Sequence, residues 1–456
     1  MPLQPACDPR AVHFTASIDR SRDAAAIVGA FAVAPRSRGC HCRGVITVVH
    51  AADLHIDSPL RGLGRLEGAP VDDLRLATRR AFVRLIDTCL EEQAALLVLA
   101  GDVFDGEWRD FNTGLFFVRE LARHIPLPDH VFTFAVDAAE TREYPRLGLA
   151  VHGQSYGARS VEDNLADAYP TARRDLFNLG VLHTNAVASA EHGNYAPCTV
   201  AQLVRHGYDY WALGHVHRRM VLHRDPWVVY PGNLQGRHAN EVGAKGCTIL
   251  RLDGLRVDAV ESREVDVLRW TELVISADAA RDMDDLLAQI RGDMEGALAG
   301  ADGRAVLARI TVEGTTDLHA ALSADPSSVQ AQVRALAAEL GEVWPEKIRF
   351  VTRPPLAELT ELNDLYQALR DELRGLADDP AALARYTEGL APLVTAAAPF
   401  LGHRPDDPER LVARLGDLEA LLLARLGAAP PVPKASSPQP HATPSAWAEG
   451  ARAHDV

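Results

Sequence analysis

This chain of 456 residues contains few lysines and has no net positive charge. Lysine supplies 3 of the 47 basic residues, and arginine supplies the others. Acidic residues outnumber basic ones by 62 to 47, which gives a formal net charge of −15. This charge balance argues against a general nucleic-acid binder that relies on overall positive charge. An enzyme that acts on nucleic acid with this balance must gather its arginines close to the site.

Long apolar segments and paired cysteines are also lacking. No run of 18 or more apolar residues occurs, which excludes a membrane-spanning helix. The cysteines are few and scattered, so we expect a reducing compartment, the cytoplasm, and no disulfide framework. Cys40-His41-Cys42 has no second pair nearby to complete a zinc site. The six cysteines are Cys7, Cys40, Cys42, Cys89, Cys198 and Cys247.

Residues 1–44 differ from the rest of the chain, because they have no clear hydrophobic period and precede a natural domain start at Val45. We expect either a disordered extension or a start codon assigned too far upstream. A signal peptide is the alternative, since Ala24–Ala34 is apolar and comes after two arginines. The long lead-in, with Asp8, Asp19 and Asp23, argues against it.

Short apolar strands alternate with amphipathic helices between residues 45 and 270. The helices are expected at Val71–Glu92 and Phe111–His124, where apolar residues recur at helical spacing. This alternation predicts an α/β sandwich of two mixed sheets. Four of the expected strands are Val45–Val49, Leu96–Leu99, Leu179–Leu182 and Tyr210–Leu213.

Each of these four strands is followed by histidine or aspartate, at the point where α/β sheets build their sites. The six side chains are Asp53, His55, Asp102, His183, His215 and His217. Two divalent metals about 3.5–4 Å apart need a shared carboxylate and separate imidazole ligands. We expect Asp53, His55 and His217 to bind one metal. Asp102 would bridge to a second metal held by His183 and His215. Mixed carboxylate and imidazole ligands suit manganese or similar ions.

The motifs Asp-x-His, Gly-Asp-x-x-Asp and Gly-His-x-His, in this order, resemble the calcineurin-like metallophosphoesterases. Three longer segments are similar in sequence to members of the bacterial DNA-repair exonuclease family, namely His50–Leu63, Tyr208–His217 and Tyr230–Cys247. That family comprises the nuclease partners of coiled-coil repair ATPases. The resemblance, which spans Val45 to Trp270, implies a two-sheet sandwich, two divalent metal ions such as Mn²⁺ and DNA as substrate. It is also compatible with a coiled-coil ATPase partner and with a homodimer, although the sequence does not reveal whether the chain dimerises.

One motif of that family is missing. Its Gly-Asn-His-Asp supplies an asparagine to the second metal and a histidine that assists the leaving group, and this tetrapeptide occurs nowhere in the chain. Arg123–Pro126 lies where the strand that leads to this motif should begin, but it is followed directly by Leu127–His130. This junction indicates an internal deletion. We therefore expect a weakened second metal site and unpaired backbone on neighbouring strands. We also expect a weakened fold around Pro126–Val136.

No nearby residue replaces the missing motif convincingly. Asn112 and His130 do not end an apolar strand after glycine, and His124 belongs to a helix end. The resemblance consequently identifies no catalytic residue in this chain.

Other polar residues in this region have two interpretations each. Arg237 and His238 come after a Pro-Gly-Asn turn, and either bind substrate phosphate or have a local role. Asp57 and Asp105 either orient a ligand or cap the surface. His152 comes after an apolar run and is expected to be a satisfied strand-end histidine.

The C-terminal part changes character. Residues 271–355 predict a small α/β accessory domain, and residues 356–426 predict a helical region. A leucine stripe at Leu411, Leu415, Leu418 and Leu422 forms either an internal core face or a partner site. Residues 427–456 are rich in Pro, Ala and Ser, which is typical of disorder.

The sequence is compatible with three hypotheses for function. The chain is a metal-dependent DNA exonuclease or phosphodiesterase, impaired by the missing segment. Alternatively, it is a catalytically dead subunit that scaffolds a coiled-coil ATPase. The third hypothesis is a defective gene product or a damaged sequence, which re-sequencing across codons 120–135 would reveal.

Overall fold

The computed structural model of the chain describes residues 28–32, 45–62, 68–105, 111–122, 131–156, 161–187, 195–355, 367–368, 370–379, 385 and 412. Two compact units are present, the first spanning residues 1–275, 284–312 and 327–349. The second spans residues 276–283, 313–326 and 350–456. Within the described part, no helix combines the length and the apolar character that crossing a membrane requires.

The first unit contains a six-stranded sheet in the order β12-β11-β2-β3-β1-β4. β2 and β3 run parallel, and β11 pairs antiparallel with β2. β3 is wholly apolar and buried, and β2 is buried after its first residue although it includes Thr47 and His50, as expected for strands covered on two faces. The strands are β1 (Val28–Ala32), β2 (Ile46–Ala51), β3 (Leu96–Ala100), β4 (Val131–Thr133), β11 (Gly246–Asp253) and β12 (Arg256–Glu264).

A second six-stranded sheet has the order β5-β6-β7-β8-β10-β9. Its central strands β6, β7 and β8 are parallel and completely buried. The strands are β5 (Glu140–Tyr144), β6 (Leu149–Gly153), β7 (Phe177–His183), β8 (Tyr210–Gly214), β9 (Met220–Arg224) and β10 (Trp227–Tyr230).

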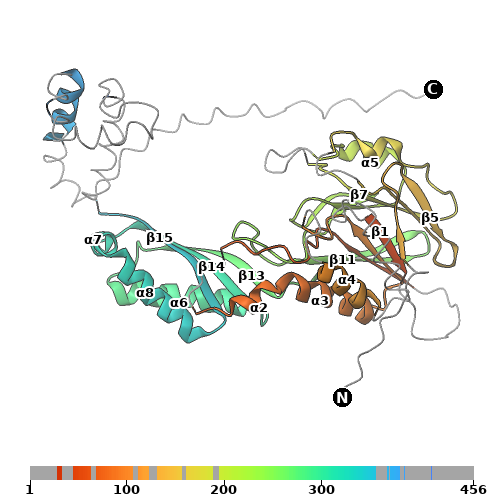
Figure 1. Cartoon of the computed structure of the whole chain (residues 1–456). Helices are drawn as coiled ribbons and strands as arrows, with labels where there is room; N and C mark the ends of the chain where they lie inside the picture. The colour runs from red at the N-terminus through yellow and green to blue at the C-terminus, as the bar shows by residue number, and fades with distance from the viewer. Residues whose placement is uncertain are drawn as a thin grey trace, which may run out of the picture. The chain divides into compact units, whose positions relative to one another are not determined.

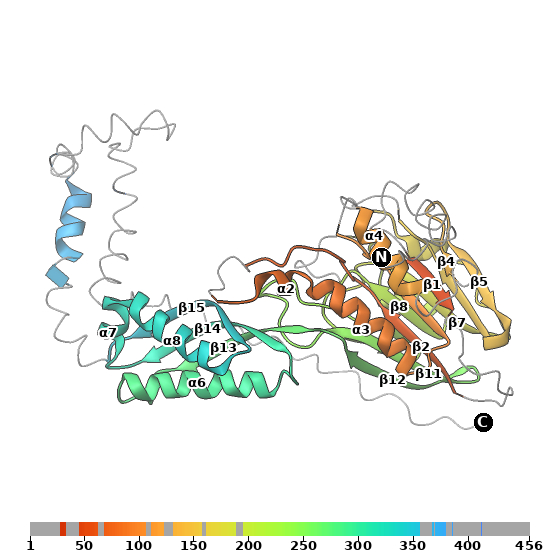
Figure 2. The same ribbon diagram turned by 60° about the horizontal axis from the view of Figure 1, so that its bottom comes forward.

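In the described part of the chain, apolar cores lie between the layers formed by the two sheets and their helices. One core lies between the two sheets and includes Val48, Val98 and Val181. A second lies between the first sheet and the helices α3 and α4, which run along one face of that sheet (Figures 1 and 2). A third packs α5 against the outer face of the second sheet. The expected two-sheet α/β sandwich is confirmed. The helices are α2 (Val71–Arg75), α3 (Ala77–Glu91), α4 (Phe111–Ala122) and α5 (Val200–Arg205).

Strand β1 comes from residues that we expected to lie outside the fold. Val28–Ala32 pairs antiparallel with β3 on one side and with β4 on the other. Phe31 packs in the core beside the helices, whereas Val28 and Ala30 face the second sheet. This alternation is that of a strand buried on both faces. The expectation of disorder is therefore wrong for these five residues, and the other residues of 1–44 lie outside the described part.

The expected gap in the sheet is also filled. β3 pairs with β1 along its whole length, from Leu96 to Ala100, so the prediction of unpaired backbone beside the deletion is wrong for this strand. On the other side of β1, Phe134 directly follows β4 and donates its backbone N–H to Val28 O at 3.0 Å. The part of the predicted weak region that precedes residue 131 lies outside the described residues.

A smaller three-stranded sheet has the order β13-β14-β15. Three strands and three helices, including the short helix α7 that the sequence did not predict, make up this α/β region, and the domain boundaries stay predictions. The predicted region 356–426, including its leucine stripe, and the tail 427–456 lie outside the described residues apart from the few named above. The elements are β13 (Leu268–Ser276), α6 (Met283–Ala299), β14 (Ala305–Thr315), α7 (His319–Ala324), α8 (Pro326–Leu340) and β15 (Val343–Arg353).

Two buried histidines make the stability of the metal-free protein sensitive to pH. Burial lowers the pKa of His50 to about 3 and that of His152 to about 4. Both rings have partners: His50 lies 3.1 Å from the Tyr210 hydroxyl, and His152 lies 3.1 Å from Asn178 Oδ1. His152 is therefore the satisfied histidine that its position after an apolar run predicts.

The folded protein should lose stability as the pH falls from about 6.5 towards about 4, because only the unfolded chain then binds protons at these rings. Urea midpoints at pH 7 and pH 5 check this, and the midpoint at pH 5 should be lower. His152→Gln should reduce the difference. An equal or higher midpoint at pH 5 would show that the rings are protonated in the folded state.

Candidate metal centre

The six predicted ligands lie at the ends of two pairs of parallel strands. Asp53 and His55 follow β2, and Asp102 follows its parallel neighbour β3. In the other sheet His183 ends β7, while His215 and His217 follow β8. Because parallel strands end at the same edge of a sheet, each pair brings its ligands together.

The backbone at these strand ends is unusual. Asp53, His55, Asp102 and His215 have positive φ angles of 52°, 44°, 48° and 100°. Positive φ is uncommon for residues other than glycine, and such conformations cluster at functional sites. Four of the six predicted ligands are therefore held in backbone conformations that the surrounding fold must impose.

Two glycines allow the sheets to approach each other here. A Cβ atom on Gly214 would lie 1.9 Å from the carbonyl oxygen of Ala100, and one on Gly101 would lie 2.5 Å from His183 Nδ1. No side chain fits at either position. The glycines of Gly-Asp and Gly-His-x-His therefore bring the ends of β3 and β8 together.

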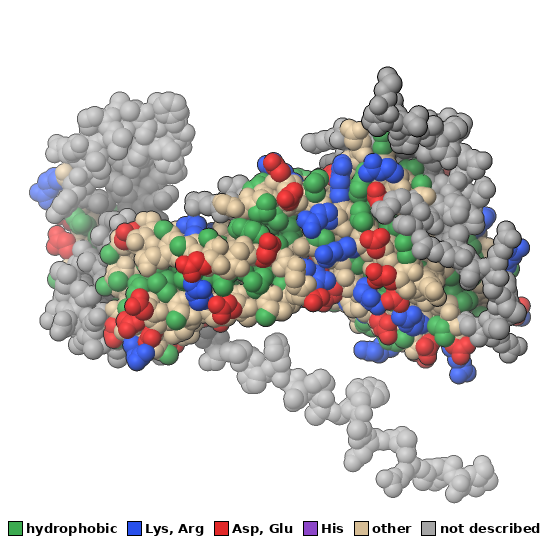
Figure 3. All heavy atoms as spheres, turned by 90° about the horizontal axis from the view of Figure 1, so that it is seen from below, with side chains coloured by type: hydrophobic (Ala, Val, Ile, Leu, Met, Phe, Trp, Pro, Cys, Tyr) green, Lys and Arg blue, Asp and Glu red, His purple; other side chains and the backbone are tan. Residues whose placement is uncertain are grey.

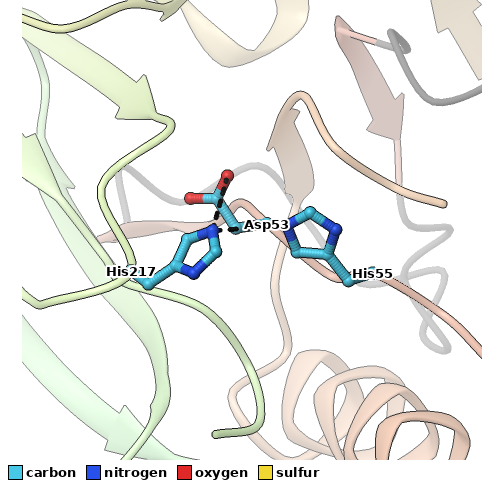
Figure 4. Close-up of side chains that lie close together, drawn as sticks. All are labelled: Asp53, His55 and His217. Atoms are coloured by element: carbon cyan, nitrogen blue, oxygen red, sulfur yellow. Dashed lines mark hydrogen bonds and ion pairs between the residues drawn. The ribbon is translucent and has the colours of Figure 1, made fainter. Parts of the chain in front are cut away.

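Asp53, His55 and His217 form one compact group of ligand atoms, all within 4.8 Å of one another (Figure 4). The two imidazole Nε2 atoms lie 3.2 Å apart, and His217 Nε2 lies 4.0 Å from Asp53 Oδ1. Asp53 is fully buried and His55 nearly so. These three side chains are those predicted for the first metal.

Asp53, Asp102 and His183 form a second group of the same size. His183 Nε2 lies 3.8 Å from Asp102 Oδ2. The other ring nitrogen, Nδ1, lies 2.8 Å from Ala100 O and donates to it, so Nε2 is the nitrogen left to bind a metal. The distance between His183 and Asp102 is well within the span of a two-metal site.

Both carboxylates reach across the two groups. Asp102 Oδ2 lies 3.5 Å from His55 Nε2 as well as 3.8 Å from His183, which is the position expected of a bridging ligand. Asp53, which we had placed with the first metal alone, belongs to both groups. Its two oxygens also accept hydrogen bonds from the backbone N–H of His215 at 3.0 Å.

The side chain of His215 is not part of either compact group. Its ring lies 5.3 Å from that of His183, measured between centroids, and stacks on Tyr195 at 5.3 Å. The backbone of His215 thus holds Asp53, and its role as a ligand to the second metal stays a prediction.

Two buried carboxylates at close range favour a cation between them. Burial raises the pKa of Asp53 well above its usual value, and the neighbouring Asp102 raises it further. For Asp102, burial opposes ionisation, but the nearby His183 and His55 hold its pKa below the usual value. A bound cation stabilises the ionised form of both groups. The donor set of carboxylates and free Nε2 atoms therefore fits divalent metal ions.

Glu241 orients His217 and was missed in the sequence. Its Oε1 accepts a hydrogen bond from His217 Nδ1 at 2.7 Å, which leaves Nε2 free. Burial lowers the pKa of His217 to about 4, so the ring is neutral and able to bind metal at neutral pH. Glu241 itself is fixed by Asn233 Nδ2 at 3.0 Å and by the backbone N–H of Arg237 at 2.7 Å.

Glu241→Gln is expected to weaken Mn²⁺ binding by about 10- to 100-fold, the usual effect of losing a carboxylate behind a histidine ligand. Calorimetric titration of the metal-free protein measures this. Glu264→Gln is the matched control, because Glu264 pairs with Arg269 and Arg304 at the surface. Equal affinities in the two variants would show that His217 needs no partner.

His55 has a different partner. Its Nδ1 lies 3.3 Å from Asp105 Oδ1, and this His55 contact, with Arg237 nearby, lowers the pKa of Asp105 to about 2. Arg237 NH1 lies 3.1 Å from the same oxygen and 3.3 Å from Ser58 Oγ. Of the two interpretations of Asp105, the structure favours orientation of a ligand.

The remaining candidates divide between the site and the scaffold. Arg237 also reaches the metal ligands, with NH2 3.4 Å from His217 Nδ1. His238 lies 3.5 Å from Glu241. Asp57 instead forms a two-pronged ion pair with Arg79 of α3 and accepts a hydrogen bond from Thr113 of α4, which is a structural role.

Comparison with known proteins supports a metallophosphoesterase-like function. Residues 270–353 match the family model described as "Metallophosphoesterase YhaO, middle domain". The chain is 29% identical over 376 residues to the uncharacterized metallophosphoesterase YhaO of Bacillus subtilis (strain 168). That alignment covers 76% of this chain and 90% of the relative.

Proposed function

We propose that this chain is a divalent-metal-dependent phosphodiesterase that acts on DNA with reduced turnover. The observation that carries the proposal is the pair of ligand groups that share Asp53 at the ends of four buried strands. Similarity to a metallophosphoesterase over most of the chain supports the same chemistry. We propose Mn²⁺ as the ion because manganese and similar divalent ions accept both imidazole and carboxylate ligands.

The chain's own residues would position the reacting phosphate. Two divalent ions held by the two ligand groups would supply a hydroxide nucleophile and neutralise charge on the phosphate. Asp53 and Asp102 would fix the spacing of these ions, and Glu241 and Ala100 O hold the imidazole rings of His217 and His183. Arg237, beside these ligands, can donate to a phosphate oxygen.

A cavity of about 480 Å³ is lined by two further arginines and by His238, which follows Arg237 in the sequence. The two arginines are Arg61 and Arg309, and Arg309 pairs with Glu346, which also lines the cavity, at 3.2 Å. The backbone of Arg61 donates to Arg237 O at 2.9 Å, which ties the cavity to the metal centre. Basic and acidic side chains are interspersed over the face shown in Figure 3. Local arginines of this kind supply the phosphate contacts that the net charge does not.

Turnover should be reduced because the chain has no Gly-Asn-His-Asp histidine to protonate the leaving group. General acid–base assistance contributes about 10²–10⁴-fold. The same absence favours the second candidate function, a pseudo-nuclease subunit that scaffolds a coiled-coil ATPase. For either function, we also propose a homodimer, an ATPase partner and a cytoplasmic location.

Degradation of linear duplex DNA in Mn²⁺ tests the proposal, with Asp102→Ala and metal-free protein as controls. We expect slow hydrolysis that both controls abolish. Metal binding without any hydrolysis above the controls would favour the scaffold function instead. Fast hydrolysis lost in the controls would show that another residue replaces the missing histidine. Hydrolysis that persists in Asp102→Ala would contradict the assigned site.

A further inference from the structure

Tyr156 contacts Asp102, the carboxylate that lies close to imidazoles of both ligand groups. Its hydroxyl donates a short hydrogen bond to Asp102 Oδ1 and accepts one from the Asp102 backbone N–H at 3.1 Å. Its ring packs against His183 with centroids 4.9 Å apart. The side chain is almost completely buried. One tyrosine therefore touches two predicted ligands.

Because of this contact, the two carboxylate oxygens of Asp102 have different partners. Oδ2 faces the imidazole nitrogens of His55 and His183, at 3.5 and 3.8 Å, whereas Oδ1 is held by the phenol. A carboxylate that serves two cations must keep a fixed orientation, since rotation about its own axis moves Oδ2 out of the site. Losing a residue that holds a metal ligand in this way typically weakens metal binding by about 10- to 100-fold.

Strand β1 holds the segment that carries Tyr156. The preceding residue, Ser155, accepts a hydrogen bond from the Val28 backbone N–H at 3.2 Å and donates to Val28 O at 3.4 Å. Ser155 also donates its backbone N–H to Ala135 O at 2.9 Å. Residues 154–156 are thus attached both to the N-terminal strand and to the chain that continues from β4.

We propose that Tyr156 is the positioning residue that fixes Asp102 in this metal centre, and that β1 acts through Ser155 to fix Tyr156. The proposal rests on the proposed metal-dependent function. It gives the N-terminal segment a part in metal binding, in a chain whose sequence has no Gly-Asn-His-Asp motif.

Mn²⁺ affinity measured by calorimetry tests the proposal in the full-length protein. Tyr156→Phe, which removes only the hydroxyl, should weaken the stronger Mn²⁺ site by about 10- to 100-fold. The matched control is Tyr208→Phe, because the Tyr208 hydroxyl donates to Pro170 O at 2.5 Å near the start of β8, away from the ligands. Both variants should have similar melting temperatures without metal, and only the first should lose affinity.

A double-mutant cycle tests the link to β1. Ser155→Ala should weaken Mn²⁺ binding in the same direction, by a smaller factor. Adding Ser155→Ala to Tyr156→Phe should cause no further loss, because Ser155 acts through the tyrosine hydroxyl. Additive losses would show that Ser155 acts independently, which would contradict this part of the proposal.

Wild-type affinity in Tyr156→Phe, together with loss of binding in Asp102→Ala, would overturn the positioning role and leave the metal centre intact. Retained binding in Asp102→Ala would instead contradict the proposed function itself. If Tyr156→Phe does not fold, Ser155→Ala alone decides, and an unchanged Mn²⁺ affinity there would overturn the proposal.

Discussion

Replacing Asp102 by alanine is expected to weaken Mn²⁺ binding at both sites by more than about 100-fold. This is more than the loss of a residue that only supports a ligand usually costs. The reason is geometric. Asp102 Oδ2 lies within 4 Å of imidazole nitrogens from both ligand groups, on His55 and His183. Without it, each group keeps Asp53 as its one carboxylate. Calorimetric titration with Mn²⁺ measures both sites.

The backbone of Asp102 requires a second variant. Its φ of 48° is strained for alanine, so a loss of binding could reflect a distorted loop. Asp102→Asn keeps the size of the side chain and tolerates this conformation better. Asp302→Ala is the control for backbone strain, because Asp302 has a φ of 51° and a side chain that is 91% exposed. Affinity near that of the wild type in Asp102→Asn would contradict the bridging role.

Deleting residues 1–32 is expected to unfold the protein or make it insoluble. Burial of Val28 and of Phe31 each contributes about 1.5–3 kcal/mol. Backbone groups of β3 that lose their partners in β1 each cost about 1–3 kcal/mol if they stay buried. The sum is comparable to the total stability of a typical domain, about 5–15 kcal/mol. Thermal unfolding followed by circular dichroism measures the effect.

A point variant separates the strand's packing from the length of the deletion. Phe31→Ala should lower the free energy of unfolding by about 3–5 kcal/mol, the usual cost of removing a buried phenylalanine. Leu255→Ala, at a side chain that is 49% exposed, should change it by less than about 0.5 kcal/mol. A chain that begins at Val45 and is as stable as the full-length protein would contradict the role of β1. It would support a start codon assigned too far upstream.

The strands that carry ligands were predictable because each combines a local apolar run with a polar residue at its end. Leu96–Leu99 and Tyr210–Leu213 were placed within one residue of β3 and β8. The helix expected at Val71–Glu92 is interrupted at Leu76, between α2 and α3. Local pattern thus sufficed for most of the sandwich.

Strand β1 was not predictable from local pattern. Val28–Ala32 is short and lies in a segment without a clear period. Its strand conformation depends on pairing with Leu96–Ala100, far along the chain, and with β4. Such non-local pairing leaves little signal in five residues.

The residues behind the ligands were missed for a related reason. Glu241 and Tyr156 act through tertiary contacts with His217 and Asp102, and neither has a characteristic spacing from its partner. The ligand residues, by contrast, could be predicted because each one lies at or just after the end of an apolar strand. Arg237 could be singled out because it comes after a turn close behind the metal histidines.

Titration of the metal-free, full-length protein with Mn²⁺ tests the central claim, that these strand ends form a two-metal centre with one weakened site. We expect one strong and one weak site, since the stronger group has His55, His217, Asp53 and the nearby Asp102. Both sites should disappear in Asp102→Asn. Failure of the wild-type protein to bind Mn²⁺, or binding that Asp102→Asn leaves unchanged, would contradict the account.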